Sequence, residues 1–376
     1  MDLPGDERWD LAGKRVLVRV DFNLPVAKVD GRLEVTDDFR LRAALPLFRD
    51  LIERGASVEA ATHFGRPHGQ VVEEFSVAPI RRRLAELAPD VELMENLRFH
   101  PGEEANDGAF GASLVAGVDY YINEAFGASH RPHASIMIPP TLVPSAAGPN
   151  LAHEVTTILS LLTNPVRPFV AIVGGAKVAD KLGIVKVLVD KADTVIVGGG
   201  MAYTFEAAQG RSIGSSLFNA DFLEECSGLL ASGKVVIPLD SRGLADGDSV
   251  GPLGGASEPI DFGANIPARC EGFDIGEQSR ALFQRAIASA RTILWNGPVG
   301  YFEDPRFLAG TAAVAFAVAS SSALSVVGGG DSVAALNQLG LEDQVSFVST
   351  GGGASLKLVE FGDLPGLRAL RESPFT

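Results

Sequence analysis

The chain has 376 residues, of which 46% are hydrophobic and 21% charged, so it is long enough to bury more than one core. Its 32 basic and 47 acidic residues give a net charge of −15, which disfavours nucleic acid and anionic membranes as partners. Cys226 and Cys270 are too few for a disulfide framework, and the first ten residues lack the basic and apolar regions of a signal peptide. These observations indicate a cytoplasmic protein with two domains.

Short β-branched runs alternate with helical patterns along the chain, which is typical of parallel sheets covered by helices. Strands are predicted at residues 15–20, 57–62, 119–123, 169–173, 194–198, 234–238, 292–295 and 325–328. Helices are predicted between them, for example at 38–54 and 178–191, and the Gly-, Asp- and Ser-rich segment 241–267 is predicted as a loop. The pattern indicates an α/β fold but does not give the order of the strands.

Two further segments bear on the domain organisation. A Pro- and Gly-rich cluster at 139–150 precedes an apolar helical pattern at 153–162, which predicts a domain boundary bridged by one helix. The uncharged segment 307–330 is long enough to span a bilayer, but its serines and glycines favour a buried helix, a turn and a short buried strand. A membrane span remains the less favoured alternative.

Basic residues gather in unusual contexts in the first half of the chain. They are Arg40, His63 and Arg66 in THFGRP, Arg98 in ENLRFH, and Arg131 in SHRPHAS. Side chains near the carboxyl ends of parallel strands converge on a ligand crevice, and arginine matches the geometry of phosphate and carboxylate groups. The set predicts a receptor for a small polyanion, although each arginine by itself is more often part of a surface ion pair. His130 and His133 flank Arg131, but no acidic residue or cysteine joins them at a familiar metal-binding spacing.

Glycine runs are characteristic of the second half: GGAKVADK (174–181), GGG (198–200), NGPVG (296–300), GGGD (328–331) and STGGG (349–353). Four of the five directly follow a predicted strand, where glycine lets the backbone approach phosphates and a following helix offers free N–H groups. The pattern predicts a nucleotide site. It has neither GxxxxGK[ST] nor GxGxxG, and Lys177 and Lys181, one helical turn apart, are candidate phosphate contacts.

Ten motifs in this order resemble those of the phosphoglycerate kinase family: GKRVLVRVDFN, TDDFRLRAALP, THFGRP, ENLRFHP, NEAFGASHRPHAS, RPFVAIVGGAKVADK, GGGMAYTF, WNGPVGYFE, GGGDS and STGGGASL. The resemblance covers residues 13 to 360. It implies two doubly wound parallel-sheet domains joined by an interdomain helix, with a deep cleft between them. The implied divisions are a phosphoglycerate-binding domain at 1–152, a hinge helix at 153–165 containing Glu154, a nucleotide-binding domain at 166–360, and a tail at 361–376 that packs back on the first domain.

The resemblance also implies the ligands and their residues. It places 3-phosphoglycerate and 1,3-bisphosphoglycerate on Asp21, Phe22, Asn23, Arg40, His63, Phe64, Gly65, Arg66, Arg98 and Arg131. It places ATP or ADP with Mg²⁺ on Gly175, Lys177, Lys181, Gly199, Gly272, Asn296, Pro298, Glu303, Gly328, Gly329, Gly330, Asp331 and Ser332, with Asp331 near the metal ion. Catalysis is expected from Arg40, Lys181 and Lys177, and a monomer is expected from the family.

Several positions depart from the family's usual pattern. Glu124 stands where Asp is usual, Pro132 replaces a small residue, and Ser332 replaces a common Thr. Larger differences lie at 148–155, where the family usually has FLMEKEL, and at 269–279, where it usually has a Trp-Met pair and DIGP. These differences affect the expected packing of the adenine pocket and the dynamics of domain closure.

Phosphoryl transfer between an acyl phosphate and a nucleotide needs no general base, because the attacking and leaving oxygens are already ionised at pH 7. It requires positioning and cancellation of charge on the transferring group, for which Arg40 and Lys181 are the first candidates, assisted by Lys177. A catalytically inactive relative that acts as a binding protein is the rival hypothesis. Such a protein would be expected to lose Arg40, Lys181 or Asp331, and this chain retains all three.

Overall fold

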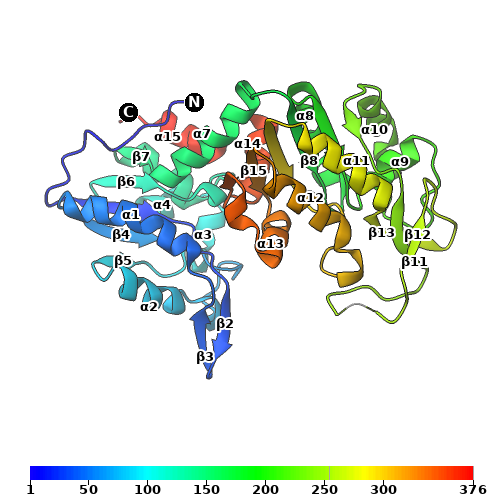
Figure 1. The fold of residues 1–376 in the computed structure, drawn as a ribbon. Helices are drawn as coiled ribbons and strands as arrows, with labels where there is room; N and C mark the ends of the chain where they lie inside the picture. Colours follow the sequence, from blue (N-terminus) through cyan, green and yellow to red (C-terminus); the bar gives the residue numbers. More distant parts are fainter. Residues whose placement is uncertain (254, 376) are drawn as a thin grey trace. The chain divides into compact units, whose positions relative to one another are not determined.

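The computed structural model describes residues 1–253 and 255–375, and it divides into two compact units. Residues 1–159 and the segment from Phe361 onward form the first unit, and residues 160–360 form the second. Each unit is built on one fully parallel sheet covered by helices, which confirms the predicted α/β class (Figure 1). The helix α7 (Pro149–Thr163) begins in the first unit and ends in the second.

The first sheet has five strands: β1 (Arg15–Arg19), β4 (Ser57–Ala61), β5 (Val91–Leu93), β6 (Tyr120–Asn123) and β7 (Ser145–Ala147). Their order in space is β5-β4-β1-β6-β7, with all neighbours parallel. The chain moves outward from β1 to one edge and then returns to build the other half from β6. In such sheets ligands bind outside the carboxyl ends of the strands at the point of reversal, here between β1 and β6.

Alternating side chains of β1 enter cores on both faces of this sheet. Val16 and Val18 pack in one core with α1 (Phe39–Glu53) and α2 (Ala78–Leu87), and Figure 1 shows α1 lying against the sheet. Leu17 packs on the other face with residues of α4 (Gly108–Leu114) and α15 (Pro365–Arg371). The strand is therefore buried on both faces, which explains its continuous apolar sequence.

Short elements complete the first unit. They are the hairpin of β2 (Val26–Val29) and β3 (Arg32–Val35), the single turns η1 (Glu73–Phe75), η2 (Leu97–Phe99) and η3 (Phe126–Ala128), and the helices α3 (Pro101–Glu104), α5 (Ala134–Met137) and α6 (Pro139–Leu142). The helix α15 contacts α5 and β7, and the backbone N–H of Gly366 donates to the carbonyl of Ser129. The C-terminal segment thus packs on the loop that follows β6.

The second sheet has six parallel strands in the order β10-β9-β8-β14-β15-β16. Their bounds are β8 (Phe169–Val173), β9 (Thr194–Val197), β10 (Val235–Val236), β14 (Thr292–Asn296), β15 (Leu324–Gly328) and β16 (Phe347–Val348). Side chains of β8, β14 and β15 pack against α11 (Glu277–Ala288) and α12 (Ala309–Ala319), while α8 (Leu182–Lys191) contacts β8 and β9. The point of reversal lies between β8 and β14, so the ends of these two strands are the expected ligand position.

The remaining elements of the second unit are η4 (Val178–Asp180), α9 (Ala202–Ala208), η5 (Ala220–Phe222), α10 (Leu223–Leu230), η6 (Pro305–Phe307), α13 (Gly330–Leu339), η7 (Glu342–Gln344) and α14 (Gly353–Phe361). A small antiparallel sheet has the order β12-β11-β13, from β11 (Ser241–Ala245), β12 (Ile260–Phe262) and β13 (Cys270–Ile275). The prediction of loop throughout 241–267 was therefore wrong. Its strands are short and rich in polar residues and glycine, so they lack the apolar runs that marked the buried parallel strands.

The uncharged segment 307–330 forms the C-terminal residue of η6, then α12 and β15, as the favoured prediction described it. Its membrane alternative is wrong, because α12 ends at Ala319 and a buried strand of the second sheet follows. None of the helices in the described chain combines the length and apolarity needed to cross a bilayer.

Candidate active site

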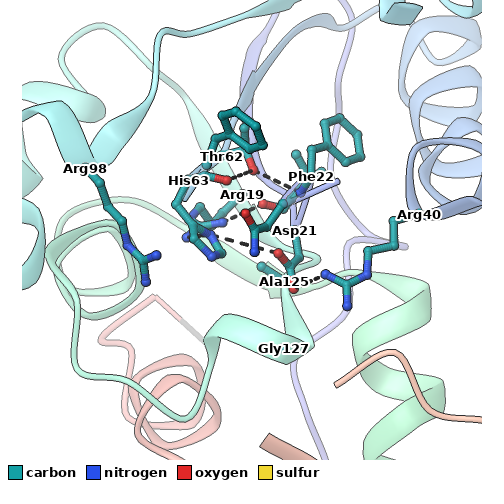
Figure 2. A network of polar contacts seen from close by, with 12 residues as sticks. Arg19, Asp21, Phe22, Arg40, Thr62, His63, Arg98, Ala125 and Gly127 are labelled. Carbon is teal, nitrogen blue, oxygen red and sulfur yellow. Dashed lines mark hydrogen bonds and ion pairs between the residues drawn. The ribbon is translucent and has the colours of Figure 1, made fainter. Parts of the chain in front are cut away.

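A polar network occupies the carboxyl ends of the central strands in the first unit. Asp21 follows β1, and its Oδ2 accepts a hydrogen bond of 3.2 Å from Nη1 of Arg40, which lies in the first turn of α1. His63 follows β4, and its Nδ1 lies 3.9 Å from Oδ1 of Asp21. Figure 2 shows Asp21 between His63 and Arg40, with Arg98 beyond His63. The structure thus brings together three of the cationic candidates at the predicted strand ends.

His63 is neutral in this network and accepts a hydrogen bond from Arg19. Burial, followed by the charges of Arg19 and Arg98, holds its pKa well below the ordinary value. Nδ1 lies 3.2 Å from Nη2 of Arg19, and a guanidinium can only donate, so Nδ1 accepts and the ring proton is on Nε2. The sequence-based view of His63 as a potential cation is corrected here: the positive charge at this site comes from arginines.

A buried group of Arg19, Glu103 and Ser135 lies next to His63. Arg19 and Glu103 are both fully buried, with Nη2 and Oε1 4.0 Å apart. Ser135 joins them, because its Oγ accepts from Nε of Arg19 at 2.9 Å and donates to Oε1 of Glu103 at 2.6 Å. The backbone N–H of Ser135 donates to Oε2 of Glu103 at 2.9 Å. This arrangement fixes the guanidinium that selects the tautomer of His63.

Sequence reasoning missed Arg19, Glu103 and Ser135. A usable signal was present for Arg19, since it is a charged residue inside the apolar run RVLVRV, and such a residue is buried only when it is paired. No comparable signal marked Glu103, which lies in a short helical turn far along the chain.

The loops around the network are tied by amide and backbone contacts. Nη1 of Arg98 donates to the carbonyl of Gly65 at 2.6 Å, and Nε lies 3.2 Å from a carboxylate oxygen of Glu104. Oδ1 of Asn23 accepts from the backbone N–H of Gly65 at 3.0 Å. Arg98, Asn23 and Gly65 are therefore neighbours, although their sequence positions span 75 residues.

Four other candidates differ in their exposure and in their partners. Phe22 and Phe64 are buried in the core beneath α1 and α2, so they support the loops from within. Arg66 is exposed, whereas Nε of Arg131 donates to Nε2 of His130 at 3.2 Å. Nδ1 of His130 then donates to the carbonyl of Gly127 at 2.8 Å, so both of its ring nitrogens are engaged.

One acceptor in the network has no hydrogen-bond partner among the residues that the structure describes. Oδ1 of Asp21 is buried and accepts no hydrogen bond, while Oδ2 is bound by Arg40. Buried carboxylate oxygens are normally satisfied, so this atom is suited to a donor brought by a ligand, such as a hydroxyl group. The same ligand would meet the guanidinium groups around it, which favours an anion that also carries a hydroxyl.

The glycine runs of the second unit all follow strands. The five runs come after β8, β9, β14, β15 and β16, so the fifth, whose strand was not predicted, joins the other four at the same edge of the sheet. Gly199 has φ of 69°, and an added Cβ would lie 2.7 Å from the carbonyl oxygen of Gly175 and 2.8 Å from that of Pro298. A side chain is excluded there because three backbone segments approach one another, which leaves a shallow backbone surface.

Lys181 lies inside this group of loops. Its Nζ hydrogen-bonds Oδ1 of Asn296, the last residue of β14. Burial lowers the pKa of the Lys181 ammonium to about 8, while the carboxylates of Asp331 and Asp180 act in the opposite direction. A bound anion would stabilise the charged form of this lysine, because it would compensate for the solvation that burial removed.

Lys177 and Lys181 do not share one helix, contrary to the prediction of a helix over 178–191. Lys177 has an extended backbone before the turn η4, and α8 begins only at Leu182. The two lysines therefore flank a tight turn. Lys177 is exposed and lines a cavity of about 170 Å³ with Gly200, Leu217 and Phe218.

Helix N-termini and hydroxyl groups complete this side of the sheet. The helix α13 begins at Gly330 directly after β15, and α14 begins at Gly353 after the STGGG run. Ser332 is buried and accepts from the backbone N–H of Gly297 at 2.5 Å, which fixes the turn after β14. The free N–H groups and positive dipole ends of these helices favour anions.

The other nucleotide candidates divide by burial. Glu303 and Asp331 are exposed, whereas Gly272, Asn296 and Pro298 are buried, and the N–H of Gly272 donates to Oγ of Ser216 at 2.9 Å. No group of three or more His, Cys, Asp or Glu side chains suited to a metal ion occurs in residues 1–253 and 255–375.

Comparisons with known proteins agree with the geometry. The phosphoglycerate kinase family model matches residues 7–92 and 88–361. The phosphoglycerate kinase of Rubrobacter xylanophilus is 45% identical over 400 residues, covering 99% of each chain, and that of Desulforudis audaxviator is 44% identical over 390 residues, covering 96% of this chain and 97% of its own. The solved structure of phosphoglycerate kinase from Coxiella burnetii is 34% identical with a TM-score of 0.88 and 99% coverage of both chains.

A second solved structure, of phosphoglycerate kinase from Pyrococcus horikoshii OT3, has a TM-score of 0.82 at 28% identity and covers 98% of both chains. Family match, full-length relatives and solved structures agree over nearly the whole chain. The chain therefore belongs to the phosphoglycerate kinase family, the phosphotransferases of glycolysis whose acceptor is a carboxyl group.

Proposed function

We propose that this enzyme transfers a phosphoryl group reversibly between 1,3-bisphosphoglycerate and MgADP, giving 3-phosphoglycerate and MgATP, by charge neutralisation without a general base. The observation that carries the proposal is the set around Asp21: a buried carboxylate oxygen with no hydrogen-bond partner in the described chain, flanked by Arg40 and by a neutral His63. This set suits a small anion that also bears a hydroxyl group.

In the first unit, the proposed phosphoglycerate contacts are the side chains of Asp21, Asn23, Arg40, His63, Arg66, Arg98 and Arg131. Asp21 accepts the hydroxyl proton, and the arginines hold phosphate and carboxylate oxygens in charge-assisted hydrogen bonds. Phe22, Phe64 and Gly65 shape the loops. His63 donates from Nε2 and stays neutral, so it neither competes with the arginines for solvation nor changes charge near pH 7.

In the second unit, the glycine loops fit a magnesium nucleotide. The close backbone approach at Gly199 leaves room for phosphates beside Gly175, and Lys177 and Lys181 supply charge. Gly328, Gly329, Gly330 and Ser332 form the start of α13, while Gly272, Pro298 and Glu303 are the proposed adenosine contacts. When bound, magnesium neutralises charge on the nucleotide phosphates, and Asp331 with Asn296 nearby would hold it on this side of the sheet.

The chemistry follows from charge. Attacking and leaving oxygens are already ionised, so the residues have only to align them and to cancel charge on the equatorial oxygens. Arg40 and Lys181 are the proposed clamp, because each is partly buried and already oriented by a partner, Asp21 and Asn296 respectively. Closure of the two domains about the helix that contains Glu154 would bring the substrates together and exclude water.

The proposal includes a monomeric cytoplasmic enzyme that needs no nucleic acid, membrane or protein partner. This part rests on the family and on the net charge of −15. Size-exclusion chromatography with light scattering tests the monomer, for which a mass near 39.4 kDa is expected.

A coupled assay of ATP formation from 1,3-bisphosphoglycerate and MgADP tests the activity, with Arg40→Ala and Lys181→Ala as inactive controls. A wild-type rate no higher than that of both variants would refute the proposed role of these residues. Small-angle scattering tests closure. The radius of gyration should shrink in the ternary complex beyond the values of the apo and the two singly liganded states, and an unchanged radius would contradict the closure step alone.

A further inference from the structure

The N-terminus of α7 is capped by a side chain from the loop that follows β6. Its N-cap is Gly148, which has no side chain to accept from the first helical N–H groups. Glu124, just after β6, replaces it: Oε1 accepts from the N–H of Asn150 at 3.2 Å and Oε2 from that of Leu151 at 3.3 Å. An added Cβ on Gly148 would lie 2.1 Å from Oε2 of Glu124. The absence of a side chain at Gly148 thus leaves the space that the carboxylate of Glu124 occupies.

Asn150 extends this cap to a second helix. Its Nδ2 donates to Oε1 of Glu124 at 2.6 Å and to the carbonyl oxygen of Ala43 in α1 at 2.8 Å. An amide nitrogen has two protons, so both bonds form at once. One side chain therefore joins β6, α7 and α1.

The bridged carbonyl lies close to a functional residue. Arg40 precedes Ala43 by three positions, so the two lie on the same face of α1. At the start of α1 the carboxylate of Asp38 binds Arg42 and Arg83, and Oδ1 of Asp37 accepts from the N–H of Phe39. The bond from Asn150 to Ala43 adds a contact from α7, three positions after Arg40.

The contact depends on the length of the Glu124 side chain. An aspartate would be shorter by one carbon–carbon bond, about 1.5 Å, which would break the 2.6 Å bond to Asn150. The carboxylate is also costly to bury, since burial raises the pKa of Glu124 to about 7 against the effect of its three donors.

We propose that Glu124 and Asn150 form a positioning pair for Arg40: they hold the first turns of α1 so that the guanidinium stays against Asp21 and is ready for the anionic substrate. This inference rests on the proposed role of Arg40. The rival is a plain helix cap, in which the pair would affect stability but not the arginine.

A double-mutant cycle on binding of 3-phosphoglycerate, measured by calorimetry, separates the two. Asn150→Ala should weaken binding about two- to tenfold, the range that one net hydrogen bond corresponds to, and leave affinity for MgADP unchanged. In an Arg40→Ala background the same change should have no further effect. In an Arg66→Ala background it should keep its full effect, because Arg66 lies on a different loop. Glu124→Asp, which cannot reach Asn150, should reproduce Asn150→Ala.

Stability controls complete the design. Asp107→Ala removes a helix cap elsewhere in the first unit, where Oδ1 accepts from the N–H of Phe110 at 2.7 Å, and should lower the urea midpoint without changing binding. Equal losses of binding from Asn150→Ala with and without Arg40 would overturn the inference, as would binding that is unchanged in both Asn150→Ala and Glu124→Asp. If Arg40→Ala by itself left binding intact, the proposed role of Arg40 would fall instead.

Discussion

The two units arrange the same kind of sheet for anions by different physical means. In the first, arginine side chains gather around Asp21 and His63 at the ends of β1 and β4, and a buried group of Arg19, Glu103 and Ser135 fixes the tautomer of His63. In the second, backbone at glycine-rich turns and helix N-termini faces the ligand position, and Lys181 is one of few cations there. Recognition by charged side chains requires that the buried charges holding them have partners. Recognition by backbone N–H groups requires loops that pack closely together.

This comparison predicts that the first unit loses most stability when its buried group of Arg19, Glu103 and Ser135 is disrupted. Glu103→Ala would leave Arg19 buried and unpaired, and it should lower the free energy of unfolding by about 3–5 kcal/mol in urea denaturation. Glu86→Ala, at the exposed pair with Arg83, is the control and should not measurably shift the midpoint. Equal midpoints for both variants would contradict the structural role of Glu103.

In the second unit, loss of the central cation should instead lower kcat. Lys181→Ala should lower kcat by about 10²-fold, because the ammonium is assigned to the transition state more than to nucleotide binding. Lys186→Ala, on α8 and ion-paired with Glu225, should leave kcat unchanged. A raised KM for the nucleotide with kcat intact would show that Lys181 acts in binding only.

The pKa of Lys181 gives this prediction a pH dependence. In the free enzyme the ammonium has a pKa of about 8, so it loses its proton as pH rises through that value. Steady-state assays should show kcat/KM for the nucleotide falling above pH 8 in the wild type, and this fall should be absent in Lys181→Ala.

The assignment of ligands to units can be tested by separate titrations. Arg98→Ala and Arg66→Ala should each weaken binding of 3-phosphoglycerate, by about 10- to 100-fold for the buried Arg98, and leave MgADP affinity nearly unchanged. Calorimetry with each ligand alone checks this. Equal losses for both ligands would mean that the variants unfold or that the sites are misplaced.

The smallest expected effect concerns an unpaired acid in the second unit, which contrasts with the fully paired Glu103. Glu206 is buried, its Oε1 has no hydrogen-bond partner in residues 1–253 and 255–375, and burial raises its pKa to about 7 from 4.5. Because the folded state holds this proton more tightly, the contribution of Glu206 is greatest below pH 4.5 and is lost as pH rises through 7. Glu206→Met should therefore stabilise the protein by about 1–3 kcal/mol at pH 8, and less at pH 5.

Urea denaturation at both pH values measures this difference. Glu277→Gln, an exposed acid in the first turn of α11, serves as the control and should not alter the pH dependence. A Met variant that gained no more stability at pH 8 than at pH 5 would show that Glu206 is solvated or paired in solution.

The sequence by itself determined the parallel α/β class, most of the central strands and the two kinds of anion-binding chemistry. These are local properties: apolar runs mark strands buried on both faces, glycine runs mark close backbone approach, and arginines mark anions. The ten motifs further identified the family. Even so, local patterns missed the strands at 241–245 and 260–262, whose stability comes from pairing with each other and with β13.

Only the tertiary structure decided which groups carry charge and what holds them. The neutral state of His63 follows from burial beside Arg19, and Glu103 reaches that arginine from a turn 84 residues away in sequence. Likewise, the bond from Asn150 to the carbonyl of Ala43 joins positions 107 residues apart, and no local pattern marks it. Protonation and orientation depend on desolvation and on neighbours brought together by the sheets, so they were fixed only when the chain was folded.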